Sequence, residues 1–198
     1  IINLSGVHAH ASEPEKGVSP GIVLSDLIRR LPLLANSNLE NSDYSLITIV
    51  HASLGAPSFG TSPADAVIML TLRAYDDNVM DAVTLDIVHT VEELSTLQKL
   101  KYSIKYTDVF PATVNHYDAF TFVRNAANRL DVEMVELNTP FKWSEDFAHF
   151  TLKSKGALFG IGSGVNQLTL HNPLYDFPDT ILDTGVQVWK EIYQQLNF

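Results

Sequence analysis

The first 108 residues alternate between strand-like and helix-like segments in a fixed order, and this order is the strongest constraint on the fold. Runs rich in β-branched residues predict strands, and apolar residues at helical spacing predict helices. The predicted elements are strand 1–8, helix 20–35, strand 44–53, strand 64–74, helix 76–97 and strand 101–106. This βαββαβ order is that of the ferredoxin-like split βαβ motif. We therefore predict a four-stranded sheet with two helices covering one face.

Residues 109–198 show a different order of elements, which indicates a second domain. The predicted elements are a helix at 115–130 capped by Asn115, a strand at 132–137, a helix that begins at Ser144, a strand at 157–162 and a helix at 179–196. The order αβαβα is typical of part of an α/β layer, although two strands alone form a marginal sheet. We expect an α/β protein with an α+β domain at residues 1–108 and a partial α/β layer at residues 109–198.

The amino-acid composition argues against two classes of binding partner, nucleic acids and membranes. The 198 residues carry a net charge of −10, whereas nucleic-acid binding requires a basic face, so we expect no nucleic-acid partner. No apolar run approaches the roughly 18 residues that a membrane span requires, so we expect no membrane partner. The sequence contains no cysteine, which excludes disulfides and thiolate metal sites and fits a cytoplasmic protein.

The first residues, Ile-Ile-Asn-Leu-Ser, are typical of a strand entered in mid-sequence. They include no initiating methionine, and they lack the charged and long apolar regions of a signal peptide. We therefore expect the chain to be a portion of a longer protein.

Two groups of motifs, one near each end of the chain, resemble a known enzyme family. The first is Gly6–Pro14, which reads Gly-Val-His-Ala-His-Ala-Ser-Glu-Pro. The second comprises Trp-Ser-Glu-Asp-Phe, Leu-His-Asn-Pro and Tyr-Asp-Phe between residues 143 and 177. In this order they resemble the dinuclear-zinc amidohydrolases and metallopeptidases, which include aminoacylases, hippurate hydrolases and carboxypeptidase G. The resemblance implies a ferredoxin-like lid that forms homodimers, followed by the C-terminal part of a catalytic domain. It also implies two zinc ions in the complete enzyme, with manganese or cobalt as alternatives.

His10 lies where the first predicted strand ends, in the sequence His-Ala-Ser-Glu-Pro. Loops at strand ends commonly carry function, and a hydrogen-bonded structural histidine is the alternative. The resemblance implies that His10 is the lid histidine that binds the substrate carbonyl oxygen, often in the active site of the other subunit. An imidazole N–H suits this role because it donates where negative charge develops. We therefore predict that His10 is a catalytic residue.

His171 lies in the Leu-His-Asn-Pro motif, and imidazole is an ordinary zinc ligand. A lone histidine is also compatible with a structural role, but the resemblance implies that His171 is the last metal ligand of the catalytic domain. Glu145 and Asp146 suit the first turn of a helix, where acidic side chains favour the helix dipole. The resemblance places this pair at the edge of the metal cleft. We therefore predict that the two carboxylates orient the metal ligands.

Arg73, in Thr-Leu-Arg-Ala, ends the third predicted strand. An ion pair with a neighbouring carboxylate is the structural explanation, and bidentate binding of a substrate carboxylate is the functional one. The resembled family often carries an arginine in a similar Thr-x-Arg setting, so Arg73 is predicted to bind substrate. The loop at 55–63 lacks the asparagine that is common in the closest members of the family, which leaves the subfamily and its specificity open.

The resemblance also defines what this sequence lacks. In the family, a Glu-Glu pair upstream of the lid supplies the base that activates a metal-bound water. Glu92-Glu93 is the only such pair here, and it falls within the predicted helix at 76–97, where an exposed helix face explains it. We therefore expect a portion of a metal-dependent amidohydrolase or peptidase that cleaves N-acyl amino acids or small peptides, inactive as this chain alone. The alternative is a non-catalytic dimerisation or binding module.

Overall fold

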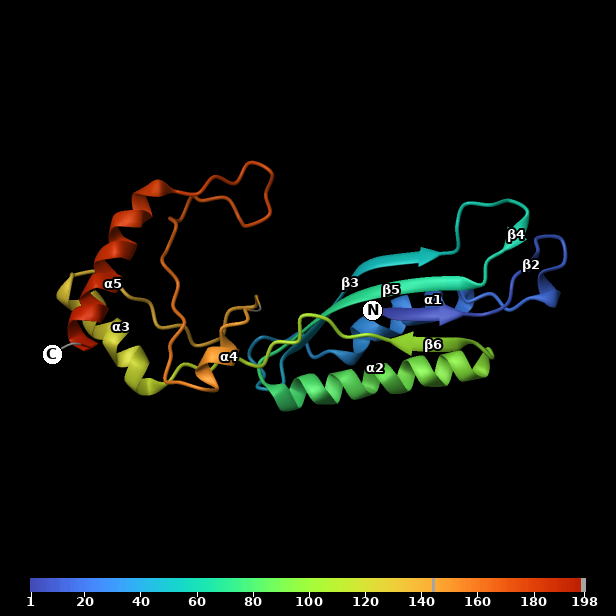
Figure 1. The fold of residues 1–198 in the computed structure, drawn as a ribbon, viewed down its shortest axis with the longest axis horizontal. Helices are drawn as coiled ribbons and strands as arrows, with labels where there is room; N and C mark the ends of the chain where they lie inside the picture. The colour runs from blue at the N-terminus through green and yellow to red at the C-terminus, as the bar shows by residue number, and fades with distance from the viewer. Residues whose placement is uncertain (144, 197–198) are drawn as a thin grey trace. The chain divides into compact units, whose positions relative to one another are not determined.

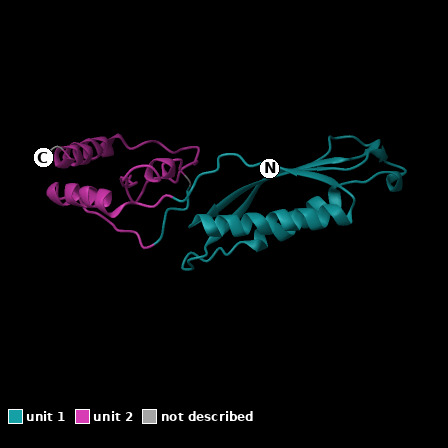
Figure 2. Ribbon diagram, turned by 60° about the horizontal axis from the view of Figure 1, so that its bottom comes forward, with its two compact units in different colours: residues 1–112, 139–144 teal, residues 113–138, 145–198 magenta. Residues whose placement is uncertain are grey.

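The computed structural model describes residues 1–143 and 145–196, and the chain forms two compact units. Unit 1 comprises residues 1–112 and 139–144, and unit 2 comprises residues 113–138 and 145–198 (Figure 2). The predicted helix start at Ser144 lies outside the described residues. Within the part of the chain that the structure describes, every helix is too short or too polar to span a bilayer.

Unit 1 is built on a four-stranded antiparallel sheet with the strand order β3-β5-β1-β6 (Figure 1). Its main elements are β1 (Ile2–Ser5), α1 (Gly21–Arg30), β3 (Ser45–Leu54), β5 (Asp65–Ala74), α2 (Asp77–Leu97) and β6 (Lys101–Ile104). Two short 3-10 helices, η1 (Pro14–Lys16) and η2 (Leu31–Leu34), complete the connections. The predicted βαββαβ order and the ferredoxin-like topology are therefore confirmed.

Alternating burial along the strands divides the sheet into a covered face and an exposed face. In β1, Ile2 and Leu4 are buried whereas Asn3 is exposed. The buried strand residues form one core cluster with Leu27 of α1 and Val91 of α2. Both helices therefore cover the same face, as the sequence predicts. Burying each side chain of this size contributes about 1.5–3 kcal/mol of transfer free energy.

Helix α2 has a defined start and a single buried stripe. The carboxylate of Asp76 accepts a hydrogen bond from the backbone N–H of Val79 at 3.0 Å, which caps the helix. The buried stripe comprises Val83, Ile87, Val91, Leu94 and Ser95. Glu92 and Glu93 are exposed, which agrees with the expected exposed helix face.

A small two-stranded ribbon was not predicted. It pairs β2 (Ala9–His10) with β4 (Thr61–Ser62) in antiparallel register, with Ala9 opposite Ser62 and His10 opposite Thr61. Two residues per strand are too few to produce a recognisable alternation. The ribbon holds the predicted catalytic histidine.

Unit 2 is built on two packed helices. Its elements are α3 (Tyr117–Arg129), α4 (Ala148–Thr151), the 3-10 helix η3 (Asp179–Ile181) and α5 (Leu182–Leu196). Val123 and Ala126 of α3 form a buried cluster with Val188 and Ile192 of α5. The helices predicted at 115–130 and 179–196 are thus present, whereas the helix predicted from Ser144 is only the single turn α4.

The two strands predicted at 132–137 and 157–162 are wrong. The structure describes both segments, and neither one forms a strand. An apolar segment becomes a strand only when a neighbouring strand accepts and donates its backbone hydrogen bonds. None of the described residues of unit 2 forms a strand that could serve as this neighbour.

Helix α5 carries a second apolar stripe that is exposed. Its members are Leu182, Val186, Trp189, Tyr193 and Leu196, all between 52% and 68% exposed. With 3.6 residues per turn, this stripe lies about 100° around the helix axis from the buried pair Val188 and Ile192. Beside it, Ile161 and Phe177 line a largely apolar hollow on the same helix. Helix α5 therefore has one apolar face packed on α3 and a second apolar face whose side chains stay more than half exposed, with the ring of Phe159 5.4 Å from that of Trp189 between centroids.

Candidate active-site residues

His10 is exposed at the edge of unit 1, and Ser12 contacts one nitrogen of its ring, Nδ1. The Nδ1 atom lies 2.7 Å from Oγ of Ser12 and accepts a hydrogen bond from the backbone N–H of Ser12 at 3.2 Å. The backbone is fixed by Glu13 N–H, which donates to the His10 carbonyl at 2.9 Å, and by Ala11 N–H, which donates to the Gly60 carbonyl at 3.0 Å. Among the described residues, no hydrogen bond or ion pair involves Nε2 of His10. The described contacts of the His10 ring therefore engage Nδ1 alone.

Two glycines allow the chain to fold tightly behind His10. A Cβ atom on Gly6 would lie 1.9 Å from the carbonyl oxygen of Val18, and one on Gly17 would lie 2.6 Å from the carbonyl oxygen of Val7. Neither space accommodates a side chain. The residues around β2 therefore pack directly on the segment that follows η1, which fixes the position of the His10 backbone.

Arg73 lies near the end of β5, far from His10. Its Nη1 atom donates to the backbone carbonyl of Lys142 at 3.0 Å. Asp65, at the other end of β5, lies 3.7 Å from the ring of His8, beside the ribbon. The eight residue steps of strand from Asp65 to Arg73 span roughly 26 Å. The structure therefore places His10 and Arg73 at opposite ends of the unit 1 sheet, and the substrate-binding role of Arg73 stays a prediction.

His171 lies in an irregular segment of unit 2 with a left-handed backbone conformation. Its φ angle is 69°, a region that few residues other than glycine adopt. Around it, Asn172 N–H donates to the Thr169 carbonyl at 3.1 Å, and the Asn172 side chain accepts from Leu174 N–H at 2.9 Å. The side chain of Gln167 donates to the Asp176 carbonyl and closes the segment. His171 is exposed at the tip of this turn.

Glu145 and Asp146 are both exposed, and they precede α4. The backbone carbonyl of Asp146 accepts a hydrogen bond from His149 N–H at 3.0 Å. The ring of Phe147, the last residue of the same motif, lies 5.9 Å from that of Phe150 between centroids. The proposed orienting role of the two carboxylates stays a prediction.

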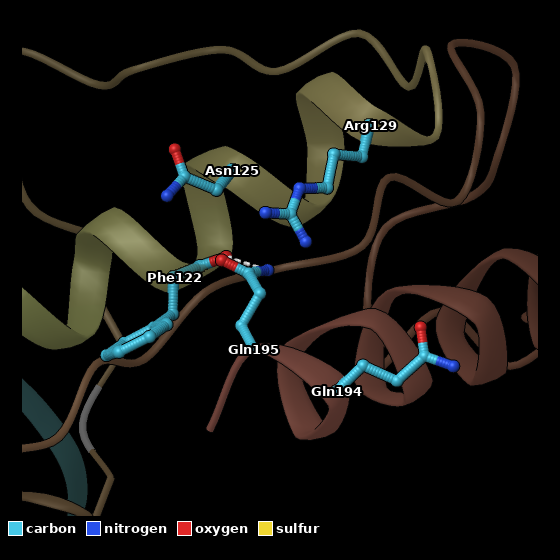
Figure 3. Close-up of a pocket in the computed structure, with 5 residues that line it drawn as sticks. All are labelled: Phe122, Asn125, Arg129, Gln194 and Gln195. Carbon is cyan, nitrogen blue, oxygen red and sulfur yellow. Dashed lines mark hydrogen bonds between the residues drawn. The ribbon is translucent and has the colours of Figure 1, made fainter. Parts of the chain in front are cut away.

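One hollow lies between α3 and α5 and is lined by Phe122 and by four polar or charged side chains, Asn125, Arg129, Gln194 and Gln195 (Figure 3). The Nε2 atom of Gln195 donates to the Phe122 carbonyl at 3.2 Å, and Arg129 forms an ion pair with Glu191 at 2.6 Å. Because the arginine is paired, its charge is already compensated. The contacts join the two helices and explain this hollow as part of their packing.

A sequence profile of peptidase family M20/M25/M40 matches residues 3–195. The chain belongs to this peptidase family. The assignment confirms the resemblance carried by the motifs around His10 and His171. An uncharacterized hydrolase of Staphylococcus epidermidis is 25% identical over 194 residues, which cover 96% of this chain and 50% of the relative. The chain thus spans about half the length of the curated relatives that it matches.

Solved structures of the M20/M25/M40 family share the fold of this chain. Aminopeptidase PepT from Bacillus cereus superposes with a TM-score of 0.72 at 16% identity, over 96% of this chain and 50% of that chain. The YXEP protein of Bacillus subtilis, described as a dinuclear metal binding peptidase, superposes with a TM-score of 0.66 at 19% identity, over 96% and 48%. At these identities the likeness establishes the fold.

Family membership raises the question of a metal site. A catalytic zinc requires about three protein ligands and an open position. Within residues 1–143 and 145–196, no group of three or more His, Cys, Asp or Glu side chains is arranged to hold a metal ion. His171 offers an imidazole of the right chemistry but no described companions. The described residues therefore do not fit a complete metal site.

Proposed function

We propose that this chain is the lid and the C-terminal catalytic part of a metal-dependent amidohydrolase or peptidase, inactive by itself. The complete enzyme hydrolyses the amide bond of N-acyl amino acids or small peptides. The observation that carries this proposal is the match of residues 3–195 to the peptidase family. A second observation supports inactivity of this chain alone: the described residues contain no cluster of metal ligands.

The geometry of His10 supports a contribution to catalysis from unit 1. The residue is exposed, and its Nδ1 atom is engaged by Ser12. A ring held in this way can donate to a carbonyl oxygen as negative charge develops on it. His171 supplies one metal ligand in the complete enzyme, and zinc is the metal whose ligand preferences this imidazole meets, with manganese or cobalt as alternatives.

The surface of unit 2 supports the proposal that this chain holds only a part of the catalytic domain. Helix α5 exposes the stripe Leu182, Val186, Trp189, Tyr193 and Leu196. Exposed apolar stripes of this length mark interfaces in soluble proteins. The curated relatives are about twice as long as this chain. Further polypeptide that forms a sheet would cover the stripe and could pair with the segments at 132–137 and 157–162.

We also propose that unit 1 forms a homodimer. The strands β3 and β6 are the two edges of an open sheet, and β3 extends over ten residues. Proteins normally cover or pair such edges. In β3, Val50 and Leu54 are exposed by 61% and 43%, which makes this edge a suitable surface for a second copy.

A non-catalytic dimerisation or binding module is the second candidate. It is favoured by the complete core of unit 1, in which both helices already cover the sheet. The two candidates predict different sequence upstream of this chain in the source reading frame. A metallopeptidase requires upstream sequence that encodes further His, Asp and Glu-Glu motifs, whereas a module does not.

The decisive experiment compares two proteins, this 198-residue chain and the product of the complete source reading frame. Both are assayed on a panel of N-acyl amino acids and small peptides with zinc, manganese or cobalt. We expect hydrolysis by the complete product only, and its loss on treatment with a chelator. No hydrolysis by the complete product with any of the three metals would contradict the proposed function.

A further inference from the structure

We propose that Ser12 is a positioning residue that holds the neutral ring of His10 in the Nε2–H tautomer. In this state His10 presents an N–H donor on its outward side. The assignment of a hydrogen-bond role to Ser12 follows from the geometry of unit 1 alone. Its importance for catalysis rests on the proposed function.

The tautomer follows from the chemistry of the atoms that face Nδ1. A backbone N–H can only donate, and Ser12 N–H lies 3.2 Å from Nδ1 of His10. The Nδ1 atom must therefore carry a lone pair and no proton. The hydroxyl of Ser12, at 2.7 Å, can turn its own proton to the same lone pair. A neutral imidazole with Nδ1 as acceptor carries its proton on Nε2.

The surrounding backbone keeps these donors in place. Ser12 lies in the turn that follows β2, and this turn is closed by the hydrogen bond from Glu13 N–H to the His10 carbonyl at 2.9 Å. Ala11 N–H is bonded to the Gly60 carbonyl at 3.0 Å, which ties the same turn to the segment before β4. Rotating the His10 ring to expose Nδ1 would break both contacts to Ser12. The turn therefore selects one orientation of the ring as well as one tautomer.

His8, two residues before His10, has different neighbours. Its Nδ1 atom lies 3.3 Å from the backbone carbonyl of Ser62, which can only accept a hydrogen bond. Its Nε2 atom lies 3.7 Å from a carboxylate oxygen of Asp65, which is also an acceptor. Acceptors therefore face both ring nitrogens of His8, whereas a backbone N–H donor faces Nδ1 of His10.

The tautomer matters because of the role proposed for His10. A carbonyl oxygen that gains negative charge is stabilised by an N–H and repelled by a ring lone pair. If the ring of His10 presented a lone pair outward, the group would be lost as a donor although the side chain remained. Ser12 would therefore act through His10, without touching the substrate itself.

Nuclear magnetic resonance of this chain tests the proposal without any enzyme activity. Long-range ¹H–¹⁵N correlations of ¹⁵N-labelled histidine distinguish the two tautomers, and they are read at the alkaline limit of a pH titration. We expect an Nε2–H pattern for His10. Ser12→Ala removes the hydroxyl but keeps the backbone N–H that faces Nδ1, so His10 should shift only part of the way toward the tautomer mixture of free histidine. Ser12→Thr, which keeps a hydroxyl, should restore the pattern.

An Nδ1–H pattern for His10 in the unmodified chain overturns the proposal. A Ser12→Ala spectrum identical to that of the unmodified chain overturns the role of the hydroxyl. In an active complete enzyme, Ser12→Ala should lower kcat about tenfold with KM little changed, because it weakens one oxyanion donor without removing it. If the spectra are as expected but the complete product is inactive, the proposed function fails and the tautomer assignment stands.

Discussion

Asn115 and Leu158 are joined by two reciprocal hydrogen bonds. The Nδ2 atom of Asn115 donates to the Leu158 carbonyl at 2.9 Å, and Leu158 N–H donates to Oδ1 of Asn115 at 2.7 Å. The next residue continues the pattern, because His116 N–H donates to the Gly156 carbonyl at 2.9 Å. The expected capping of α3 by Asn115 is therefore wrong. Its amide mimics a backbone unit and ties the start of α3 to a distant segment.

The first prediction concerns this pair. Asn115→Ala removes both hydrogen bonds and should lower the free energy of unfolding of unit 2 by about 1–2 kcal/mol, since each bond contributes about 1 kcal/mol. Hydrogen exchange at the Leu158 amide should accelerate, and a thermal melt should show the lost stability. Asn125→Ala, at an exposed position of α3, is the control and should leave both measurements close to those of the unmodified chain. Unchanged exchange at Leu158 would contradict the pairing.

How much the sequence predicts differs between the two units, and hydrogen-bonding partners explain the difference. In unit 1 each strand has its partner within the same 108 residues, so apolar alternation such as that of Ile2 and Leu4 predicts the observed sheet. In unit 2 the segments at 132–137 and 157–162 have the same apolar character, but the described residues supply no strand beside them. Periodicity reports which residues are suited to pairing, and it does not report whether a partner exists.

The candidate site shows the same limit at the level of single residues. The sequence places His10 at a strand end, but its contact with Ser12 depends on the turn geometry, which no periodic signal encodes. The strand-end position of Arg73 and its Thr-x-Arg setting predict a substrate contact, and only the strand register reveals that it lies at the far end of the sheet from His10. Residue types therefore identify candidates, whereas long-range pairing decides which of them share a surface.

The second prediction is that the chain dimerises through the edge of the unit 1 sheet or an adjoining helix. Sedimentation at high micromolar concentration should show a dimer. Val50→Lys places a charge on the exposed edge strand β3 and should shift the protein toward monomer, because charged side chains disfavour edge pairing. Leu85→Lys on α2 tests the helix in the same way.

The control for the dimer experiment is Phe59→Lys, in the loop between β3 and β4. This side chain is fully exposed, so the same change from apolar to charged should leave the sedimentation unaltered. A monomer for the unmodified chain at high micromolar concentration would count decisively against dimerisation through the lid.

The third prediction separates catalysis from folding at His10. In the complete enzyme, His10→Ala should change the free energy of unfolding by no more than about 1 kcal/mol, as for most exposed side chains. It should lower kcat by about a hundredfold, the scale on which an oxyanion donor contributes. His8→Ala removes another exposed imidazole, two residues before His10, and is the matched control. Equal kcat values for His10→Ala and the unmodified enzyme would reject the assignment.

The last prediction is that this 198-residue chain, alone, binds zinc weakly and has no hydrolytic activity. His171 is its one proposed ligand, whereas a catalytic zinc requires about three, and no cluster of three suitable side chains exists among the described residues. Calorimetry with zinc should show no sub-micromolar site, and His171→Ala should leave the titration almost unchanged. In the complete product the same substitution should weaken metal binding strongly, because there His171 would complete a preorganised set of ligands. Sub-micromolar zinc binding together with turnover of an N-acyl amino acid by the 198-residue chain would show that its own residues assemble the site.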